Sequence, residues 1–506
     1  MNSKKLGFNN AAYIEQQSAE IMNRAERFGK LYLEVGGKLF QDLHAARVLP
    51  GFDPDVKIKM LQKLGNRVEV VVCIYSGDIE HRKYRADFGT TYDNEVLRIV
   101  DEVRSYGINV STIVMTRYNP KMKGARGFAN KLKKVGLKVV YHSVTAGYPD
   151  DIEKILSEEG CGKNPYIQTE RPVVAVIAPG PMSGKFATCL NQLYHDYKAG
   201  IHSGYAKLET FPVWNLPLDH PVNIAYEAAT ADLLDENMID SFHEKAYGIK
   251  AVNYNRDIEA FPILHELLMR VSGEEMYKSP TDMGVNRVGF AIDNDNLVSI
   301  AARKEILRRH LRTICDVMIG RAEEATLEKT QALINKLSIT EAELPVIASA
   351  RQAAIEAAKD PNKGNQGIYC AAAIQLKDGT IIIGKNTKLL HAASAMLLNA
   401  LKHLAGIPDW LDLLPANYTK SIHAMKQASF TQSSLSLDVS ELLVALGICA
   451  ANSIAAERAI EKLPELNGCE VHLTHMMGSG DAQGLQRIGV RATTDPFYPT
   501  KKLFVQ

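Results

Sequence analysis

The sequence lacks the features that mark membrane, secreted and zinc-binding proteins. No apolar run among its 506 residues approaches the roughly 18 residues of a membrane span. The first ten residues contain no apolar core of a signal peptide. The seven cysteines are scattered and form no Cys-x-x-Cys pair. We therefore expect a cytoplasmic protein with reduced core thiols, no membrane partner, no disulfide framework and no zinc.

Net charge is also nearly absent. Lys and Arg number 59 and Asp and Glu number 58, which gives a net charge of +1 and no long-range attraction to nucleic acid. The basic stretch 121–138 contains one aromatic residue, Phe128, so a solvated helix face is the better interpretation and no nucleic-acid partner is expected. Hydrophobic and charged contents of 46% and 23% are typical of globular proteins.

The first half of the chain alternates apolar segments with helical patterns. The segments that predict strands are residues 31–35, 68–75, 109–115, 137–142 and 173–177. Such near-continuous apolar strands separated by helices indicate a mostly parallel, doubly wound α/β sheet covered on both faces. Ligands of these sheets bind beyond the carboxyl ends of the strands. Glycine turns at 36–37, 76–77 and 180–184 follow predicted strands, so we expect them to meet at one crevice.

Changes in composition divide the chain into three parts, as expected for its length. Residues 1–296 form the predicted α/β domain, with two subdomains as an alternative if the chain breaks near 160–171. Residues 297–360 contain almost no glycine and repeat at helical period, which predicts a helical segment. Residues 361–506 form a second α/β domain, which begins after a turn-rich boundary.

A glycine-rich turn between a predicted strand and a predicted helix is the most informative motif. It spans 178–185 and ends in Ser183-Gly184-Lys185. Backbone N–H groups at such a turn, with a helix start and a lysine, suit a phosphate. The motif departs from a Walker A loop, because Gly180 is one residue too close to Gly184 and Phe186 replaces the magnesium-binding hydroxyl. A simple packing turn is the alternative.

The candidate cofactor site consists of the turn and one hydroxyl in the following helix. Thr188 lies one helical turn after Gly184 and is the expected substitute for the missing hydroxyl. Carboxylates further along the chain are candidate magnesium ligands, because magnesium prefers oxygen, although a solvated helix cap is the commoner role. The residues assigned to phosphate or nucleotide are Gly180, Pro181, Met182, Ser183, Gly184, Lys185 and Thr188, those assigned to catalysis are Lys185, Asp232 and Asp235, and the metal candidate is Asp240.

Two other segments supply candidate substrate residues. Residues 205–223 are too rich in proline, aromatic and amide side chains for a regular element, which predicts a long loop that is either functional or simply packed. The segment after the first predicted strand resembles a phosphate-binding turn followed by a short helix. The candidates are Gly36, Gly37, His44 and Arg47 near the amino end and Trp214, Asn215, His220 and Asn223 in the loop.

The last segment resembles the cytidine-deaminase-like fold. It opens with a predicted hairpin around Asp378-Gly379, and His391 begins an amphipathic helix. In that superfamily a His-x-Glu and a Pro-Cys-x-x-Cys hold zinc. Ala393 stands where the glutamate would be, and the cysteine motif is absent. The resemblance therefore implies a scaffold without zinc chemistry, which forms either one wall of an interdomain cleft or the interface of a homo-oligomer.

Four runs resemble a family of uncharacterised bacterial proteins catalogued as a domain of unknown function. They are residues 33–40, 47–52, 178–185 and 214–218, and the resemblance covers the whole chain. It implies no activity. From the residues we expect a small phosphorylated ligand, with ATP or another nucleotide and magnesium as the candidate cofactors. The hypotheses are a phosphotransferase or nucleotide-dependent ligase, a non-catalytic sensor of a phosphorylated metabolite, and a phosphate-ester lyase or hydrolase that needs no nucleotide.

Overall fold

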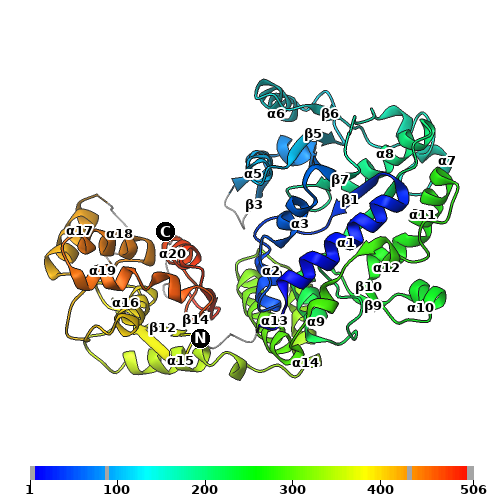
Figure 1. Cartoon of the computed structure of the whole chain (residues 1–506). Coiled ribbons are helices and arrows are strands. Elements are labelled where there is room, and N and C mark those ends of the chain that lie inside the picture. Colours follow the sequence, from blue (N-terminus) through cyan, green and yellow to red (C-terminus); the bar gives the residue numbers. More distant parts are fainter. Residues whose placement is uncertain (1–5, 86–89, 430–435, 499–506) are drawn as a thin grey trace. The chain divides into compact units, whose positions relative to one another are not determined.

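The structure is a computed structural model that describes residues 6–85, 90–429 and 436–498. The chain divides into two compact units (Figure 1), which we call the N-terminal unit, Met1–Ala302, and the C-terminal unit, Arg303–Gln506. Each unit has its own sheet and its own apolar core. The fold is therefore mixed α/β in both parts of the chain.

A seven-stranded sheet lies at the centre of the N-terminal unit. Its order is β11-β8-β1-β7-β2-β5-β6, and all neighbouring strands are parallel. All residues of β1 and β7 are buried, so helices and loops cover both faces, as the apolar runs predict. The strands are β1 Leu31–Val35, β2 Val68–Tyr75, β5 Asn109–Thr116, β6 Val139–Tyr141, β7 Val173–Ile177, β8 Gly204–Leu208 and β11 Gly284–Val285.

One strand corrects an interpretation made from the sequence. Residues 204–208, assigned in part to an irregular loop, form β8, in which Tyr205 pairs with Tyr32 of β1. Lys207 interrupts the apolar pattern of this strand and conceals it. The strand tolerates the lysine because the Lys207 ammonium contacts two carboxylates, Glu209 and Asp257. The loop itself begins after Leu208 and ends where α9 starts at Pro221.

Helices of the N-terminal unit pack their apolar faces on this sheet. The side chain of Asn9 caps the first helix, α1, by accepting from Ala12 N at 3.1 Å. Helix α1 then runs along the unit against β1, β8 and β11 (Figure 1). The helices are α1 Asn10–Phe28, α2 Leu43–Val48, α3 Val56–Leu64, α4 Ser76–Glu80, α5 Tyr92–Ser105, α6 Lys123–Lys134, α7 Ile152–Ile155, α8 Lys185–Lys198, α9 Pro221–Ala229, α10 Ser241–Tyr247, α11 Asn255–Ser272 and α12 Pro280–Met283.

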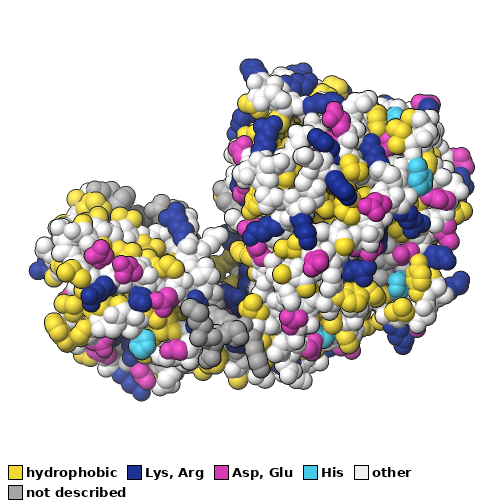
Figure 2. Space-filling model, viewed as in Figure 1, with side chains coloured by type: hydrophobic (Ala, Val, Ile, Leu, Met, Phe, Trp, Pro, Cys, Tyr) yellow, Lys and Arg dark blue, Asp and Glu magenta, His cyan; other side chains and the backbone are white. Residues whose placement is uncertain are grey.

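Two small antiparallel strand pairs complete the N-terminal unit. One pairs β3 (Tyr84–Arg85) with β4 (Thr90–Thr91), and the other pairs β9 (Asn237–Ile239) with β10 (Val252–Tyr254). Lys and Arg side chains are spread over the visible face of this unit with acidic side chains between them (Figure 2), in agreement with the low net charge of the chain.

Helices occupy the glycine-poor stretch that precedes the second sheet. They are α13 Asp295–Met318, α14 Glu324–Lys336 and α15 Val346–Ala357. The C-terminal sheet has the order β13-β12-β14-β15, with β12 antiparallel to both neighbours and β15 parallel to β14. Its elements are β12 Ala371–Gln375, β13 Ile381–Lys385, α16 Ala392–Ala405, α17 Ala416–Ser429, α18 Val439–Ala450, α19 Ile454–Ile460, β14 Glu470–Leu473, α20 Ser479–Ile488 and β15 Arg491–Thr494.

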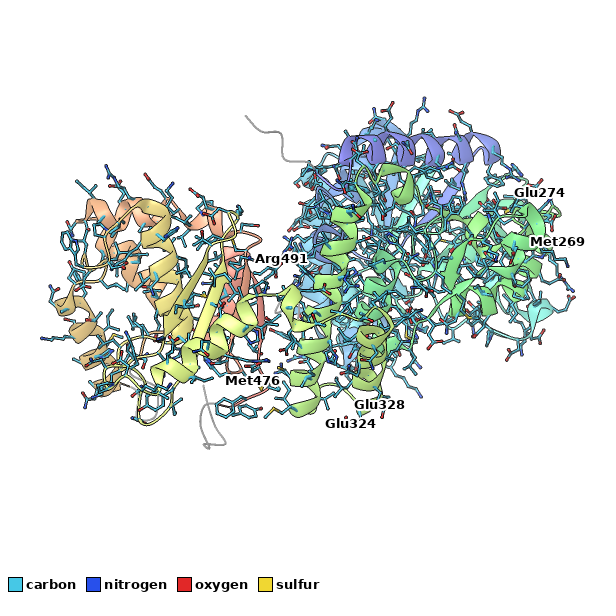
Figure 3. All side chains as sticks on the ribbon, turned by 90° about the horizontal axis from the view of Figure 1, so that it is seen from below. Met269, Glu274, Glu324, Glu328, Met476 and Arg491 are labelled. Carbon is cyan, nitrogen blue, oxygen red and sulfur yellow. The ribbon has the colours of Figure 1, made fainter. Side chains whose placement is uncertain are left out.

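A buried ion-pair network ties α13 to this sheet. Arg308 donates two hydrogen bonds to the carboxylate of Glu470, at 2.8 and 2.9 Å, and a third to Glu305 at 2.9 Å. Arg491, labelled in Figure 3, begins β15 and lies 3.4 Å from Glu470. Because Arg308 and Glu470 are both nearly inaccessible to solvent, this network joins the helical stretch to the second sheet within one unit.

All seven cysteines are buried free thiols, which confirms the prediction of core thiols. Burial raises the pKa of Cys73, Cys161 and Cys370 to about 12, so these thiols are neutral and poor nucleophiles near neutral pH. Among the helices that the structure describes, none combines the length and the apolar character that crossing a membrane requires.

Candidate functional site

Three glycine turns lie along one edge of the N-terminal sheet. Strands β1, β7 and β2 are adjacent and parallel, so the predicted turns at 36–37, 180–184 and 76–77 follow the same carboxyl edge, although residues 76–77 form the start of α4. Side chains join the second and third turns, because Thr116 Oγ1 donates to Ser183 O at 2.8 Å and Ser76 Oγ donates to Thr116 O at 2.9 Å. The strand order thus brings together turns that are far apart in the sequence.

Residues 180–185 form the segment that we call the β7 loop. Packing explains why both of its glycines, Gly180 and Gly184, are needed. A Cβ on Gly180 would lie 2.5 Å from the ring of Tyr92. Gly184 has a φ of +84°, and a Cβ there would lie 3.0 Å from Thr116. Met182 has a positive φ of 54° and an exposed side chain. The loop is therefore held tightly at its glycines and presents Met182 outward.

Backbone donors are available where the β7 loop enters α8. In the part of the chain that the structure describes, no acceptor contacts the N–H groups of the five residues from Ser183 to Ala187. The first N–H groups of a helix have no partner within the helix. Thr188 differs, because its hydroxyl donates to Gly184 O at 3.0 Å and accepts from the Cys73 thiol at 3.4 Å. That hydroxyl is buried beneath the loop.

Two cations accompany these donors. Lys185 is the first residue of α8, and its Nζ lies 3.8 Å from Glu34 Oε1 of β1. Arg117 directly follows β5, donates to Met182 O of the loop, and places its guanidinium carbon 3.5 Å from the centre of the Tyr75 ring. Arg117 was missed by the sequence interpretation. Its place directly after a predicted strand is the signal that could have identified it.

A charged group beside Lys185 was also missed. Lys207 Nζ lies 2.7 Å from Glu209 Oε1 and 2.6 Å from Asp257 Oδ2, and Tyr205 donates to Glu34 Oε2 at 2.9 Å. We call Glu34, Lys185, Lys207, Glu209 and Asp257 the ionic cluster. It contains three carboxylates and two ammonium groups, and each of these side chains is no more than 28% exposed.

Glu209 is the carboxyl group of the ionic cluster whose pKa is raised. Burial, helped by the carboxylates of Asp257 and Glu34 and opposed by Lys207, raises the pKa of Glu209 to about 7. A carboxyl group that titrates near neutral pH can both accept and donate a proton under physiological conditions. Among the described residues, no group of three or more His, Cys, Asp or Glu side chains is arranged to hold a metal ion.

The turn after β1 lies beside this cluster. Gly36 N donates to Leu208 O at 2.8 Å, and a Cβ on Gly36 would lie 3.6 Å from Glu209 Cγ. Lys57 donates to Gly36 O at 3.0 Å, and its ammonium would lie 3.2 Å from a Cβ on Gly37. Two of the predicted substrate residues, Gly36 and Gly37, are therefore neighbours of the ionic cluster.

His44 and Arg47 lie on α2, the short helix after that turn. The His44 ring packs edge-on against Phe211 and Tyr226, with centroid distances of 5.5 and 5.8 Å. This aromatic packing supports a structural role for His44.

The predicted magnesium carboxylates have local contacts. Asp232 is exposed in a single turn of 3₁₀ helix. Asp235 is buried and lies 2.5 Å from Arg256 Nε. Asp240 is fully buried and caps α10, with one oxygen accepting from two backbone N–H groups and the other from the N–H and hydroxyl of Thr281. Asp240 therefore has the helix-cap role of the alternative, whereas Asp235 is held by an ion pair.

Most of the predicted polar residues in the loop after β8 make hydrogen bonds that hold this loop in place. Trp214 Nε1 donates to Asn286 O at 3.0 Å. His220 caps α9 and lies 2.9 Å from Asp295 Oδ1. Asn223 is fully buried; its side-chain oxygen accepts a hydrogen bond from Val213 N, and its side-chain nitrogen donates one to Val213 O. Asn215 is the exposed member of the predicted set.

Comparisons with known proteins give the family but no chemistry. The family model described as domain of unknown function DUF1846, N-terminal, matches residues 6–338, and that of its C-terminal part matches residues 342–504. A UPF0371 protein of Clostridium botulinum (strain Alaska E43 / Type E3) is 48% identical over 503 residues, 99% of each chain. A UPF0371 protein of Clostridium tetani is 48% identical over 501 residues, again 99% of each chain.

Proposed function

The chain belongs to the DUF1846 family of bacterial proteins, and we propose from its own geometry that it binds a phosphorylated ligand at the β7 loop. The N–H groups from Ser183 to Ala187, at the carboxyl end of a central parallel strand, are the observation that carries this proposal. A helix start with free donors attracts anions. Lys185 and Arg117 add positive charge at the same loop.

An enzyme is the first candidate, and the ionic cluster is the reason. Glu209, which titrates near neutral pH, belongs to the same group of charges as Lys185. Backbone donors with a lysine stabilise the charge that develops on a transferred phosphoryl group, and a nearby carboxyl group can take up the proton of the acceptor. Phosphoryl transfer or nucleotide-dependent ligation is the proposed reaction class, and cleavage of a phosphate ester without nucleotide is the alternative.

A non-catalytic sensor of a phosphorylated metabolite is the second candidate. It is favoured by Phe186 in place of the magnesium-binding hydroxyl, by the engaged hydroxyl of Thr188, and by the cap contacts of Asp240. Under this proposal the loop binds the phosphate without magnesium-assisted turnover. Turnover of a bound nucleotide separates the two candidates, because a sensor leaves the nucleotide unchanged whereas a transferase or ligase converts it.

For the C-terminal unit we propose a deaminase-like scaffold that acts in assembly. Support comes from its strand order, with β12 antiparallel to β13 and β14, and from His391 at the start of α16. His391 Nδ1 contacts Asp481 at 2.8 Å, and Ala393 occupies the position of the catalytic glutamate. The exposed apolar side chains Val444 and Ile448 on α18 support a homo-oligomer, which we expect to be cytoplasmic. Light scattering of the purified chain tests the oligomer.

The binding proposal is tested by thermal shift and calorimetry against phosphate, sulfate, sugar phosphates and nucleotides, with and without magnesium. A ligand at 100 times its Kd stabilises the native state by about 2.7 kcal/mol. We expect Lys185→Ala to abolish the shift and Arg117→Gln to weaken it. Lys198→Ala is the matched control, because Lys198 is an exposed lysine at the opposite end of α8. No shift with any phosphorylated ligand, or equal shifts in Lys185→Ala and wild type, contradicts the proposal.

A further inference from the structure

A cavity in the C-terminal unit has a wall that the proposed function does not use. It has a volume of about 430 Å³, within the usual range of small-molecule sites, roughly 300–1,000 Å³. Strand β13, α16 and the start of α17 line it, together with the segment before β12. A second, shallower cavity of about 600 Å³ shares Ile383, Asn399 and Lys402 with it and continues along β13. The two form a continuous groove.

The polar part of the first cavity is rich in donors. Three lysines line it, Lys363, Lys385 and Lys402, against one carboxylate, Asp412. Lys385 lies 3.1 Å from Glu356, and Lys402 donates to Asp409 O at 3.0 Å. The Lys363 ammonium contacts no hydrogen-bond or ion-pair partner among residues 6–85, 90–429 and 436–498. Glu356 neutralises Lys385, and Asp412 balances one of the other two lysines. The wall of the first cavity therefore has a net charge of about +1.

Two of these lysines lie on neighbouring segments of the first cavity's wall. Gly364 N donates to Asn386 O at 2.8 Å, so the chain segments that carry Lys363 and Lys385 run side by side. Leucines form much of the remaining wall of the first cavity, among them Leu390, Leu398 and Leu413. The second cavity adds Ile381, Ile382 and Ile407 but also His403 and Asp409, so the mainly apolar wall is that of the first cavity. Lysines beside an apolar wall within the first cavity match an amphipathic molecule with an anionic headgroup.

We propose that this groove binds an aliphatic anion, a carboxylate or phosphate monoester with an unbranched alkyl chain. The headgroup accepts hydrogen bonds from Lys363 and Lys385, and the chain lies along Leu390, Leu398 and Ile383. Charge-assisted hydrogen bonds to the two ammonium groups fix the orientation, and burial of methylene groups supplies the remaining affinity. The site is independent of the β7 loop and does not rest on its proposed function.

Calorimetry on the full chain tests the groove with four ten-carbon probes, below their critical micelle concentrations. They are decanoate, decyl phosphate, decanol and decylamine. We expect the two anions to bind and the alcohol and amine to bind at least about tenfold more weakly, since they lose the charge-assisted hydrogen bonds. Octanoate should bind more weakly than decanoate by up to about fourfold for each methylene removed. The better of the two anions identifies the headgroup.

Variants separate the groove from general surface binding. Lys363→Gln should weaken decanoate binding about tenfold, whereas Lys377→Gln, an exposed lysine in the turn between β12 and β13, should leave it unchanged. Ala395→Phe fills the cavity from a half-buried position on α16 and should abolish binding, with an unchanged circular dichroism spectrum as the folding check. Equal binding of amine and anion, no binding of either anion, or equal effects of the two lysine variants overturns the proposal.

Discussion

The Lys185 ammonium lies 3.8 Å from Glu34 Oε1, so the lysine of the β7 loop forms an ion pair with a carboxylate of the neighbouring strand β1. Glu34 also accepts from the Tyr205 hydroxyl at 2.9 Å. The two side chains are 14% and 11% exposed. This pair joins the β7 loop to the ionic cluster and makes both part of one electrostatic unit at the carboxyl edge of the sheet.

Glu34→Gln should destabilise the N-terminal unit by about 2–3 kcal/mol, because it leaves Lys185 without its charged partner in a poorly solvated place. The measurement is urea unfolding followed by Trp214 fluorescence in a Trp410→Phe background, which removes the other tryptophan of the chain. Glu26→Gln is the control, since Glu26 and Arg67 form a surface pair with both side chains more than 60% exposed, and it should cost less than about 0.5 kcal/mol. A similar loss in both variants would show that the pair has no special role.

Gly180→Ala should cost about 1–3 kcal/mol through overpacking, because the new Cβ would lie 2.5 Å from the Tyr92 ring. In a Tyr92→Ala background the same substitution should cost at least about 1 kcal/mol less, since the clash is gone. Gly107→Ala is the control, with a positive φ and nothing near its Cβ, and its cost should not depend on Tyr92. Additive effects of Gly180→Ala and Tyr92→Ala would contradict the packing explanation.

Glu209 should make the stability of the N-terminal unit depend on pH between about 4.5 and 7. Its pKa is raised in the folded state from 4.5 to about 7, with burial as the main cause. The folded state therefore binds this proton more tightly than the unfolded state. The contribution of Glu209 is fully present below pH 4.5 and is lost as the pH rises through 7.

Glu209→Gln should remove that part of the pH dependence. The measurement is the free energy of unfolding from pH 4.5 to 8 for wild type and variant, with Trp214 as the probe. The difference between the two curves should change across this window and level off above pH 7. Glu26→Gln should leave the slope as it is in wild type. A constant difference between wild type and Glu209→Gln at every pH would show that Glu209 is ionised throughout.

Glu470→Gln should destabilise the C-terminal unit by about 2–3 kcal/mol, because it breaks a buried ion pair with Arg308 and leaves that guanidinium with the Glu305 carboxylate alone among its described partners. Faster hydrogen exchange of β12 and β14 is the expected readout. Arg312→Gln serves as the control, since Arg312 lies about one helical turn after Arg308 on the same helix, is 72% exposed, and pairs only with Asp316 among its described contacts. Unchanged exchange in Glu470→Gln would contradict the assigned role of the network.

The sheet of the N-terminal unit shows how far the sequence alone leads. All five strands predicted there exist, because parallel strands buried on both faces need continuous apolar runs that are visible without any tertiary information. Strand β8 was missed, because Lys207 interrupts its apolar pattern, and one of the two carboxylates that neutralise this lysine, Asp257, comes from α11. Pattern analysis cannot anticipate a buried lysine whose partner lies 50 residues further along the chain.

The candidate site also has one part that the sequence predicts and another that only the fold brings together. The β7 loop was identifiable, because a strand, a glycine turn and a helix form a local pattern that does not depend on the rest of the fold. Arg117, Glu34 and Glu209 became neighbours of that loop only when the strand order placed β5, β1 and β8 along the same edge. The predicted carboxylates were judged by closeness in sequence, and Asp240 is instead a helix cap.

The sequence by itself determined the fold class, the buried thiols and the family, since each depends on composition, local periodicity or whole-chain similarity. The tertiary structure alone decided which charges meet. Strands that pair in a sheet need not be consecutive in the chain, and β7 lies between β1 and β2 although it follows both in sequence. The electrostatics of the carboxyl edge are therefore a property of strand order, which short-range patterns do not encode.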